Sequence, residues 1–331
     1  MSQVSLSDWQ QFLLSFPDAH ILQTGEWGEI KAAFGWQVER VVWDQVGAQI
    51  LFRPVFRLAS LAYIPKGPVG IPSPLFWQEI IRVCRRKRAL LLKVEPDCWE
   101  TEAANMVTHW AGFHPHGRPI QVQRTIVVNL EGKPDDWLMR MKQKTRYNIR
   151  LAEKKGVEVA VSVNIQKFHK LMELTSARDG FAVHSLEYYQ YVYDLFAAKN
   201  QCVLLEARWG EKTLAMIMVF YRGKRAWYFY GASTDEERNR MPTYLLQWEA
   251  MKWVAAQGCT EYDLWGIPDR DEDELERDFA NREDGLWGVY RFKRGFGGQI
   301  KRTIGAFELG FVPGIVPLFR YFEKGARHRS E

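Results

Sequence analysis

Lysine and arginine gather in three short runs of this 331-residue chain. The runs are Arg82 to Arg88, Lys142 to Lys155 and Arg291 to Arg302, although the net charge of the whole chain is only +5. Cations clustered in this way attract phosphate-bearing partners such as RNA and sugar nucleotides. A run of Lys and Arg is also common on a solvated helix face. The composition by itself leaves both interpretations open.

Covalent and metal catalysis have no recognisable residue pattern in the sequence. The seven histidines form no metal-ligand spacing, and no Ser-His-Asp or Cys-His arrangement is visible. The four cysteines are far apart and lack CxxC spacing, so we expect reduced and mostly buried thiols. We therefore expect no metal, no cofactor and no covalent enzyme intermediate.

Length and hydropathy indicate a cytoplasmic protein of two domains. No stretch approaches the roughly 18 consecutive apolar residues that spanning a bilayer requires. The start of the chain, Met1 to Gln11, is polar, carries Asp8 and lacks the basic and apolar regions of a secretory signal. With 331 residues the chain exceeds the usual size of one compact core. We expect a cytoplasmic monomer without a transmembrane segment.

Two successive series of helices and strands would position the candidate residues. In the first series, apolar periodicity predicts helices at 6–16, 26–34 and 75–88 and strands within 37–57 and 89–94. The second series opens with a charged helix from Asp136 to Lys155. Further helices are expected at 165–175, 186–198 and 242–258, and strands at 157–163, 202–208, 214–221, 226–231 and 262–265.

The two series share one order of elements, which favours an α/β (α+β) fold of two tandem GNAT-like domains packed around an inter-domain cleft. The first domain is expected to cover 1–133 and the second 134–303. The C-terminal segment 304–331 contains a short aromatic helix within Phe311 to Phe322 and is expected to dock back on the first domain.

Seven short sequence phrases, each present once, follow one another along the chain. They are TGEWGEIK (24–31), YIPKGP (63–68), KVEP (93–96), KTRYNIRLAEKKGV (144–157), TSARDGF (175–181), YDLWG (262–266) and GVYRFKRGFGG (288–298). Together they resemble the Fem (FemABX) family of peptidoglycan-bridge aminoacyltransferases. The chain is similar to the compact form of that family, since no long heptad pattern follows that would form the helical arm of larger members.

The resemblance implies two fused GNAT-like domains and a defined pair of substrates. The donor would be aminoacyl-tRNA, and the acceptor would be the side-chain amine of a stem peptide in a peptidoglycan precursor. That precursor would be UDP-MurNAc-peptide or its lipid-linked form, which allows transient contact with a membrane surface. Because the donor ester is already activated, positioning could supply most of the rate. The remaining needs are amine deprotonation, oxyanion stabilisation and protonation of the leaving ribose hydroxyl.

The stretch Arg238 to Tyr244 bears on the identity of the acyl donor. An acetyltransferase that uses coenzyme A holds pyrophosphate on a glycine-rich turn, because backbone N–H groups must approach the phosphates closely. The corresponding stretch here has no glycine, and Pro242 removes one N–H donor. An acyl-CoA donor is therefore disfavoured. A small-molecule N-acyltransferase that uses acyl-CoA remains the first rival function, and a non-catalytic RNA-binding module the second.

Three residues match the family's acyl-transfer centre. Lys293 would stabilise developing charge at the tRNA acceptor end, and Phe292 would shape the same channel. Glu95 ends a buried strand, which could raise its pKa and suit a general base for the incoming amine. Binding of the substrate ammonium is the alternative role of Glu95. The alternative for Lys293 is a solvated cation in a basic turn.

Five residues are candidates for binding the precursor, and not all of them match the family. Lys31 would contact the diphosphate as a flexible point charge, or it is a surface lysine of an amphipathic helix. His184 stands where relatives carry an arginine four residues before the tyrosine, here Tyr188. Since histidine is only partly charged at neutral pH, Arg178 could support diphosphate binding. Tyr230 would line the precursor groove, or it is a core tyrosine of a strand.

The basic clusters supply the candidates for contact with tRNA. Arg146 lies on the helix that also carries Lys142, Lys144, Arg150 and Lys154. Arg291 and Arg294 flank the candidate catalytic lysine. Phosphate contacts of this kind would make binding salt-sensitive. The alternative is that the basic residues complement the negative end of a helix.

Overall fold

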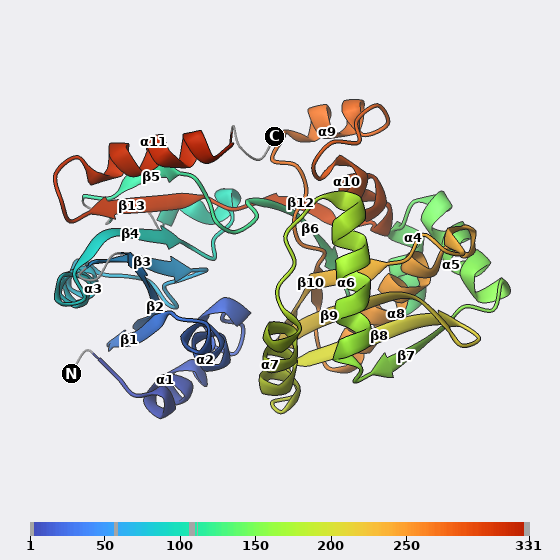
Figure 1. Ribbon diagram of the computed structural model, residues 1–331, viewed down its shortest axis with the longest axis horizontal. Helices are drawn as coiled ribbons and strands as arrows, with labels where there is room; N and C mark the ends of the chain where they lie inside the picture. Colours follow the sequence, from blue (N-terminus) through green and yellow to red (C-terminus); the bar gives the residue numbers. More distant parts are fainter. Residues whose placement is uncertain (1–2, 56–58, 106–109, 111, 328–331) are drawn as a thin grey trace. The chain divides into compact units, whose positions relative to one another are not determined.

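The computed structural model describes residues 3–55, 59–105, 110 and 112–327 (Figure 1). The chain divides into two compact units, one formed by Met1–Gln123 with Arg302–Glu331 and the other by Arg124–Lys301. Each unit contains one mixed β-sheet covered by helices. This is the α/β architecture expected from the sequence. The expected cleft between the domains remains a prediction.

The first unit is built on a six-stranded sheet of order β1-β2-β3-β4-β13-β5. Its strands are β1 (Gln37–Trp43), β2 (Val46–Val55), β3 (Ala59–Pro65), β4 (Ala89–Glu95), β5 (His114–Gly117) and β13 (Ala306–Gly310). Its helices are α1 (Leu6–Leu13), α2 (Gly25–Ala33), α3 (Pro74–Arg86) and α11 (Ile315–Arg327), with 3₁₀ turns η1 (Ile21–Gln23) and η2 (Glu100–Asn105). The C-terminal segment thus returns to the first unit, where β13 pairs with β4 and β5.

Local sequence explains where the helices of this unit begin. The Ser73 hydroxyl accepts a hydrogen bond from the Phe76 amide at 3.2 Å, and Pro74 occupies the first helical turn of α3. Phe76 and Ile80 then bury one face of α3 against the sheet. The Thr24 hydroxyl caps α2 in the same way, by accepting from the Trp27 amide at 3.4 Å.

The second unit is built on a seven-stranded sheet of order β12-β6-β11-β10-β9-β8-β7. Its strands are β6 (Arg124–Asn129), β7 (Glu158–Ser162), β8 (Cys202–Trp209), β9 (Lys212–Arg222), β10 (Arg225–Ser233), β11 (Glu261–Asp263) and β12 (Gln299–Arg302). Its helices are α4 (Pro134–Arg140), α5 (Gln143–Lys154), α6 (Ile165–Asp179), α7 (Leu186–Ala197), α8 (Pro242–Ala256), α9 (Glu272–Asp278) and α10 (Trp287–Lys293). Two 3₁₀ turns, η3 (Arg238–Arg240) and η4 (Arg294–Phe296), complete it.

Helices cover both faces of this second sheet (Figure 1). Neighbouring residues of a strand point to opposite faces. On β9 the ring of Phe220 packs against Phe196 of α7, with centroids 5.1 Å apart, whereas the next residue, Tyr221, packs against Trp253 of α8 at 5.1 Å. The sheet is therefore buried between α7 on one face and α8 on the other.

Two expectations about this region are corrected by the structure. The predicted helix from Asp136 to Lys155 is two helices, α4 and α5, because Met141 is extended and buried and the Lys142 amide donates to the Gly295 oxygen at 2.9 Å. The division between the units lies after Gln123 rather than after residue 133. The reason is that β6 pairs with β11 in the second sheet. Both differences arise from contacts between segments distant in sequence.

Candidate functional site

Lys293 lies at the C-terminal end of α10 and is buried, with 6% of its surface exposed. Its Nζ atom donates hydrogen bonds to the main-chain oxygens of Trp265 and Gly266, each at 2.9 Å. The Nζ atom also lies 5.6 Å from the centroid of the Tyr228 ring. Burial lowers the pKa of Lys293 to about 7, although the nearby Asp263 carboxylate acts in the opposite direction. The side chain is therefore a buried amine that can change protonation state near neutral pH.

Asp263 and Thr125 are the residues near Lys293 that the sequence analysis missed. The Asp263 carboxylate is buried and accepts hydrogen bonds from the Thr125 hydroxyl and from the Trp265 amide, the latter at 2.7 Å. Asp263 belongs to the phrase YDLWG at 262–266, which carried part of the family resemblance. The phrase could have pointed to this acid, but only pairing of β6 with β11 places Thr125 beside it.

Phe292 packs inside the second unit. Its ring lies 5.0 Å from Tyr244 and 5.1 Å from Phe296, both in edge-to-face geometry. The neighbouring glycines are needed for close packing, since a Cβ on Gly295 would lie 2.1 Å from the Thr145 hydroxyl. Gly297 has a φ of +76°, and a Cβ there would lie 2.4 Å from the Arg140 main-chain oxygen. These glycines allow the segment to approach the connection between α4 and α5.

Glu95 ends β4 in the first unit and is 4% exposed. Its carboxylate accepts hydrogen bonds from the Tyr63 hydroxyl at 3.1 Å, from the Gln121 amide at 2.9 Å and from the Ile120 amide. Burial raises the pKa of Glu95, and the two amides and the Lys66 cation partly oppose that rise. The expected elevation of the pKa is present, while the carboxylate already has three donors of its own.

Lys31 lies in the last turn of α2, where its Nζ atom is 4.7 Å from the centroid of the Trp27 ring. Burial lowers the pKa of Lys31 to about 8.

A buried hydrogen bond holds helix α2 to the sheet, since the Gln49 side chain of β2 donates to the Thr24 oxygen at 2.8 Å. Gly28 permits this approach, because a Cβ there would lie 2.2 Å from the Gln49 side-chain oxygen.

The structure brings His184, Tyr188 and Tyr230 together. The His184 ring stacks on Tyr188 with centroids 4.0 Å apart, and the Tyr230 ring lies 6.5 Å from His184. The pKa values of Tyr188 and Tyr230 are raised by burial, and the two hydroxyls are hydrogen-bonded to each other. Tyr189 packs edge-on against Tyr230 at 5.2 Å. Three of the residues expected to bind the precursor thus form one aromatic cluster.

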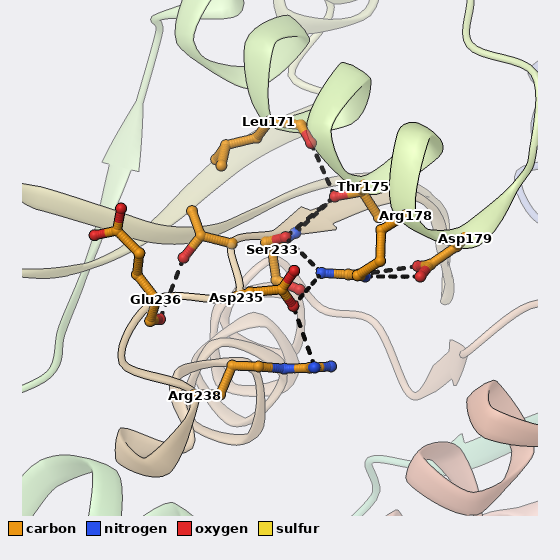
Figure 2. A network of polar contacts seen from close by, with 9 residues as sticks. Leu171, Thr175, Arg178, Asp179, Ser233, Asp235, Glu236 and Arg238 are labelled. Carbon is orange, nitrogen blue, oxygen red and sulfur yellow. Dashed lines mark hydrogen bonds and ion pairs between the residues drawn. The ribbon is translucent and has the colours of Figure 1, made fainter.

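Arg178 belongs to a separate polar network, which Figure 2 shows from close by. Its guanidinium forms two hydrogen bonds with Asp179, at 2.7 and 2.9 Å, and one with Asp235 at 3.0 Å. It also donates to the Ser233 main-chain oxygen at 3.2 Å. The network joins the end of α6 to the end of β10. The cationic group of Arg178 is therefore balanced by two carboxylates of its own unit.

The three arginines expected to bind tRNA are engaged in contacts within the second unit. Arg146 donates to the main-chain oxygen of Met141, at the end of α4. Arg291 donates to the oxygens of Phe279 at 3.0 Å and Arg282 at 3.1 Å. Arg294 forms two hydrogen bonds with Glu276, one of them at 2.7 Å. Arg294 holds the pKa of Glu276 down, to about 2.

The exposed face of α5 presents other cations. Lys144 and Arg150 are exposed, and Tyr147 between them is 61% exposed. These positions are three residues apart and share one side of the helix. Basic and aromatic side chains on one face are suited to phosphates and unstacked bases of RNA. Helical periodicity could have separated this face from Arg146, which is turned toward the end of α4.

The turn before α8 is occupied by side chains. Arg240 donates to the Lys155 main-chain oxygen at 2.7 Å, and its guanidinium carbon lies 3.5 Å from the centroid of the Trp209 ring. Met241 adopts a left-handed conformation with a φ of +57°, and Pro242 begins the helix. The Arg240 and Met241 amides donate to the Glu237 and Arg238 oxygens, at 2.8 and 3.0 Å, and Pro242 has no N–H, so these three residues offer no free N–H group to a pyrophosphate.

Within the described ranges, no group of three or more His, Cys, Asp or Glu side chains is arranged to hold a metal ion. Among the helices formed by the described residues, none is both long and apolar enough to span a bilayer. All four cysteines are buried, and within the described residues none of them forms a disulfide.

Comparison with known proteins agrees with the resemblance found in the sequence. The lipid II:glycine glycyltransferase of Staphylococcus saprophyticus is 24% identical to this chain, over 93% of this chain and 92% of its own. The crystal structure of FemX superposes with a TM-score of 0.84 at 21% identity, covering 97% of this chain and all of that one. A tandem GNAT protein from the clavulanic acid pathway superposes with a TM-score of 0.56 at 10% identity, covering 95% and 98%. These two structures show the fold.

The family itself is established by a match over most of the sequence. The FemAB family model matches residues 99–208 and 205–324, which include β6 to β13 and most of α11. The curated relatives that match along the chain are named as glycyltransferases, which transfer an amino acid. The chain therefore belongs to the FemAB family and is an aminoacyltransferase.

Proposed function

We propose that this protein transfers an amino acid from aminoacyl-tRNA to the side-chain amine of a stem peptide in a peptidoglycan precursor. The main support is the match along 93% to 98% of the chain to enzymes named lipid II:glycine glycyltransferases. A buried lysine, Lys293, in the phrase that resembles the family's transfer motif supports it further. The acceptor is a lipid-linked or nucleotide-linked precursor. Peptidoglycan bridge formation is the resulting biological role.

The reaction needs little covalent help from the protein. The amine nitrogen attacks the carbonyl carbon of the aminoacyl ester, a C–N bond forms, and the C–O bond to the ribose breaks. The acceptor ammonium first releases one proton to solvent, and the proton that the amine then loses on forming the amide passes to the leaving ribose oxygen. Holding the amine nitrogen close to the ester carbonyl carbon supplies most of the rate enhancement. A positive charge beside the developing oxyanion supplies a further part.

Lys293 is the group proposed to supply that charge. A cation beside an oxyanion is most effective where water is excluded, and Lys293 is 6% exposed. Phe292 packs beside it as part of the supporting core. Glu95 is proposed to hold the acceptor ammonium by charge rather than to remove its proton, because its oxygens already accept from Tyr63, Ile120 and Gln121.

The first unit is proposed to bind the precursor through Lys31, and the aromatic cluster of His184, Tyr188 and Tyr230 is proposed to contact the same substrate. Arg178 supports this cluster by joining α6 to β10. The second unit is proposed to receive the acceptor end of tRNA. Arg146, Arg291 and Arg294 shape that region through their contacts within the unit, and the exposed face of α5 contributes phosphate contacts.

The test is a mass-resolved transfer assay with a panel of aminoacyl-tRNAs and of lipid-linked and nucleotide-linked precursors. Transfer of one amino acid to one precursor is the expected result, with Lys293→Met lowering kcat and Lys31→Ala raising the KM of the precursor. Acyl transfer from acyl-CoA, with none from any aminoacyl-tRNA, would instead identify a GNAT-type N-acyltransferase. Unchanged kinetics in both variants would remove the roles given to the two lysines.

A further inference from the structure

An irregularity in the second sheet lies directly beside Lys293. Directly after β11, which ends at Asp263, the ladder with β6 continues, and the Leu264 amide donates to the Ile126 oxygen at 2.9 Å. In a regular antiparallel ladder, the next bond would come from the second residue after Leu264 to the second residue before Ile126. The Arg124 oxygen accepts instead from Ile267, the third residue after Leu264, at 3.0 Å. One extra residue is therefore accommodated, which is the definition of a β-bulge.

Three contacts hold this bulge, which we define as residues 264–267. Trp265 has a φ of +61°, in the left-handed region that a bulky L-residue seldom adopts. Its amide donates to the Asp263 carboxylate at 2.7 Å, and the same carboxylate oxygen accepts from the Thr125 hydroxyl. Its indole ring packs on Phe229 with centroids 4.4 Å apart. Asp263 is thus the polar anchor of the bulge.

The bulge turns two main-chain oxygens toward one side chain. Those of Trp265 and Gly266 accept from the Lys293 Nζ atom, each at 2.9 Å. A regular strand would direct successive carbonyls to opposite sides, so both could not reach the same atom. In the ammonium form Nζ has three N–H groups, and these two oxygens engage two of them. Within the described part of the chain the third is left for a ligand.

We propose that Asp263 is the positioning residue of Lys293: by anchoring the bulge it aims the Trp265 and Gly266 oxygens at Nζ and so orients the one remaining N–H toward the reacting ester. Asp263 does not itself touch substrate in this proposal. The benefit of this orientation for catalysis rests on the proposed function. The orientation of the Lys293 side chain itself requires no substrate.

The ionisable groups that face Lys293 come from two neighbouring strands. Asp263 on β11 favours the ammonium form, as a negative charge should. Tyr228 on β10 is adjacent, and its pKa is raised by burial to about 12, so it is neutral in the working range. Asp263 is therefore the neighbouring group whose charge can shift the titration of Lys293.

The experiment compares Asp263→Asn and Thr125→Val with the intact protein. Asparagine keeps the shape and one acceptor oxygen of Asp263 but loses the charge, whereas valine removes the second donor to the carboxylate. Asp269→Asn is the matched control, because Asp269 lies in the following loop and pairs with Arg124 at 3.2 Å. Two readouts are taken on each protein: titration of the Lys293 side chain by NMR of ¹³C-lysine-labelled samples, assigned with Lys293→Met, and the pH profile of kcat.

Loss of the negative charge disfavours the ammonium form of Lys293. Asp263→Asn should therefore lower the pH at the midpoint of the Lys293 titration. The high-pH limb of kcat should move in the same direction, and kcat below that limb should fall about 10-fold. Thr125→Val should lower kcat without shifting the titration, and Asp269→Asn should change neither. Where Asp263→Asn proves unfolded by circular dichroism, the Thr125→Val comparison decides the question.

A folded Asp263→Asn protein whose Lys293 titrates as before would overturn the inference. So would a Thr125→Val protein with unaltered kcat. Because the NMR titration requires no substrate, a shifted titration with no aminoacyl transfer in any protein would leave the positioning role intact and reject the proposed function instead.

Discussion

The imidazole ring of His184 stacks on the phenol ring of Tyr188, with centroids 4.0 Å apart and planes inclined by 23°. The family resemblance places an arginine at position 184, and a guanidinium can stack on an aromatic ring in the same way. The Tyr188 hydroxyl is in turn hydrogen-bonded to Tyr230. The His184 ring thus stacks on Tyr188 at the position where the resemblance implies an arginine, and a histidine is only partly charged at neutral pH.

His184→Arg should tighten binding of the precursor, because arginine adds a permanent charge and a bidentate donor for a diphosphate. His184→Ala should weaken binding by about 3- to 10-fold, the effect of losing one stacked polar contact. Equilibrium titration with the precursor measures both effects. His114→Ala, an exposed histidine of β5, is the control. Equal affinity in all four proteins would exclude His184 from the precursor site.

Binding of the precursor should also weaken as the pH rises through about 8. Burial lowers the pKa of Lys31 to about 8, so the cation that would contact the diphosphate is lost above that value rather than above its ordinary value. Lys31→Arg keeps its charge and should abolish this dependence between pH 7 and 9. Equilibrium affinity is the measurement to use, because titration of Lys293 affects turnover. A flat affinity profile in the original protein would contradict the prediction.

Lys293→Met should lower activity and should also change how stability depends on pH. Loss of a charge beside an oxyanion should lower kcat about 100-fold. The folded pKa of about 7 lies below the ordinary value of 10.5, so between these values the unfolded chain holds a proton that the folded protein lacks. The free energy of unfolding of the original protein should therefore increase as the pH rises. The Lys293→Met protein should not show this increase.

Thermal and urea unfolding at several pH values measure the second effect. From pH 7 to pH 9 the free energy of unfolding of the original protein should rise by about 2 kcal/mol relative to Lys293→Met. Lys170→Met, at an exposed position of α6, is the control and should run parallel to the original protein. A parallel Lys293→Met curve would mean that Lys293 is charged throughout this range.

The salt dependence of tRNA affinity should distinguish exposed basic residues from those that form contacts within the protein. Lys144 and Arg150 are exposed on α5, so replacing either with serine should reduce the slope of log affinity against log salt by about 0.7 to 0.9. Arg146→Ser removes a hydrogen bond to the Met141 oxygen, so it should mainly lower the melting temperature. Binding of tRNA measured from low to moderate salt tests this. An unchanged slope in the two surface variants would exclude the face of α5.

Much of the fold could be predicted because its elements are encoded locally. The apolar positions of α3 and its cap at Ser73 lie within one short segment, as do the apolar residues of β4. Helices α6, α7 and α8 also lie where periodicity predicted them. The break between α4 and α5 could not be predicted, because it depends on the Gly295 oxygen, which lies far along the chain.

The candidate site was predictable only where a motif carried it. Lys293 and Glu95 belong to phrases that resemble the family, and the raised pKa of Glu95 follows from a carboxylate at the end of a buried strand. The carboxylate of Asp263 acts on Lys293 through a β-bulge, and no sequence period reveals one extra residue between two strands. Likewise, Arg146 and Arg150 look alike in sequence, and only their orientation on α5 separates them.

The sequence by itself determined the family, the order of helices and strands, and which residue types are available for transfer, because motifs and hydrophobic periods are local properties. Tertiary structure alone decided which cations are buried, which are neutralised and which stay exposed. The reason is that burial and hydrogen bonding depend on segments that are distant in sequence and meet only in the fold. Lys293 shows this most clearly, since its lowered pKa and its two carbonyl partners come from other strands and turns than its own helix.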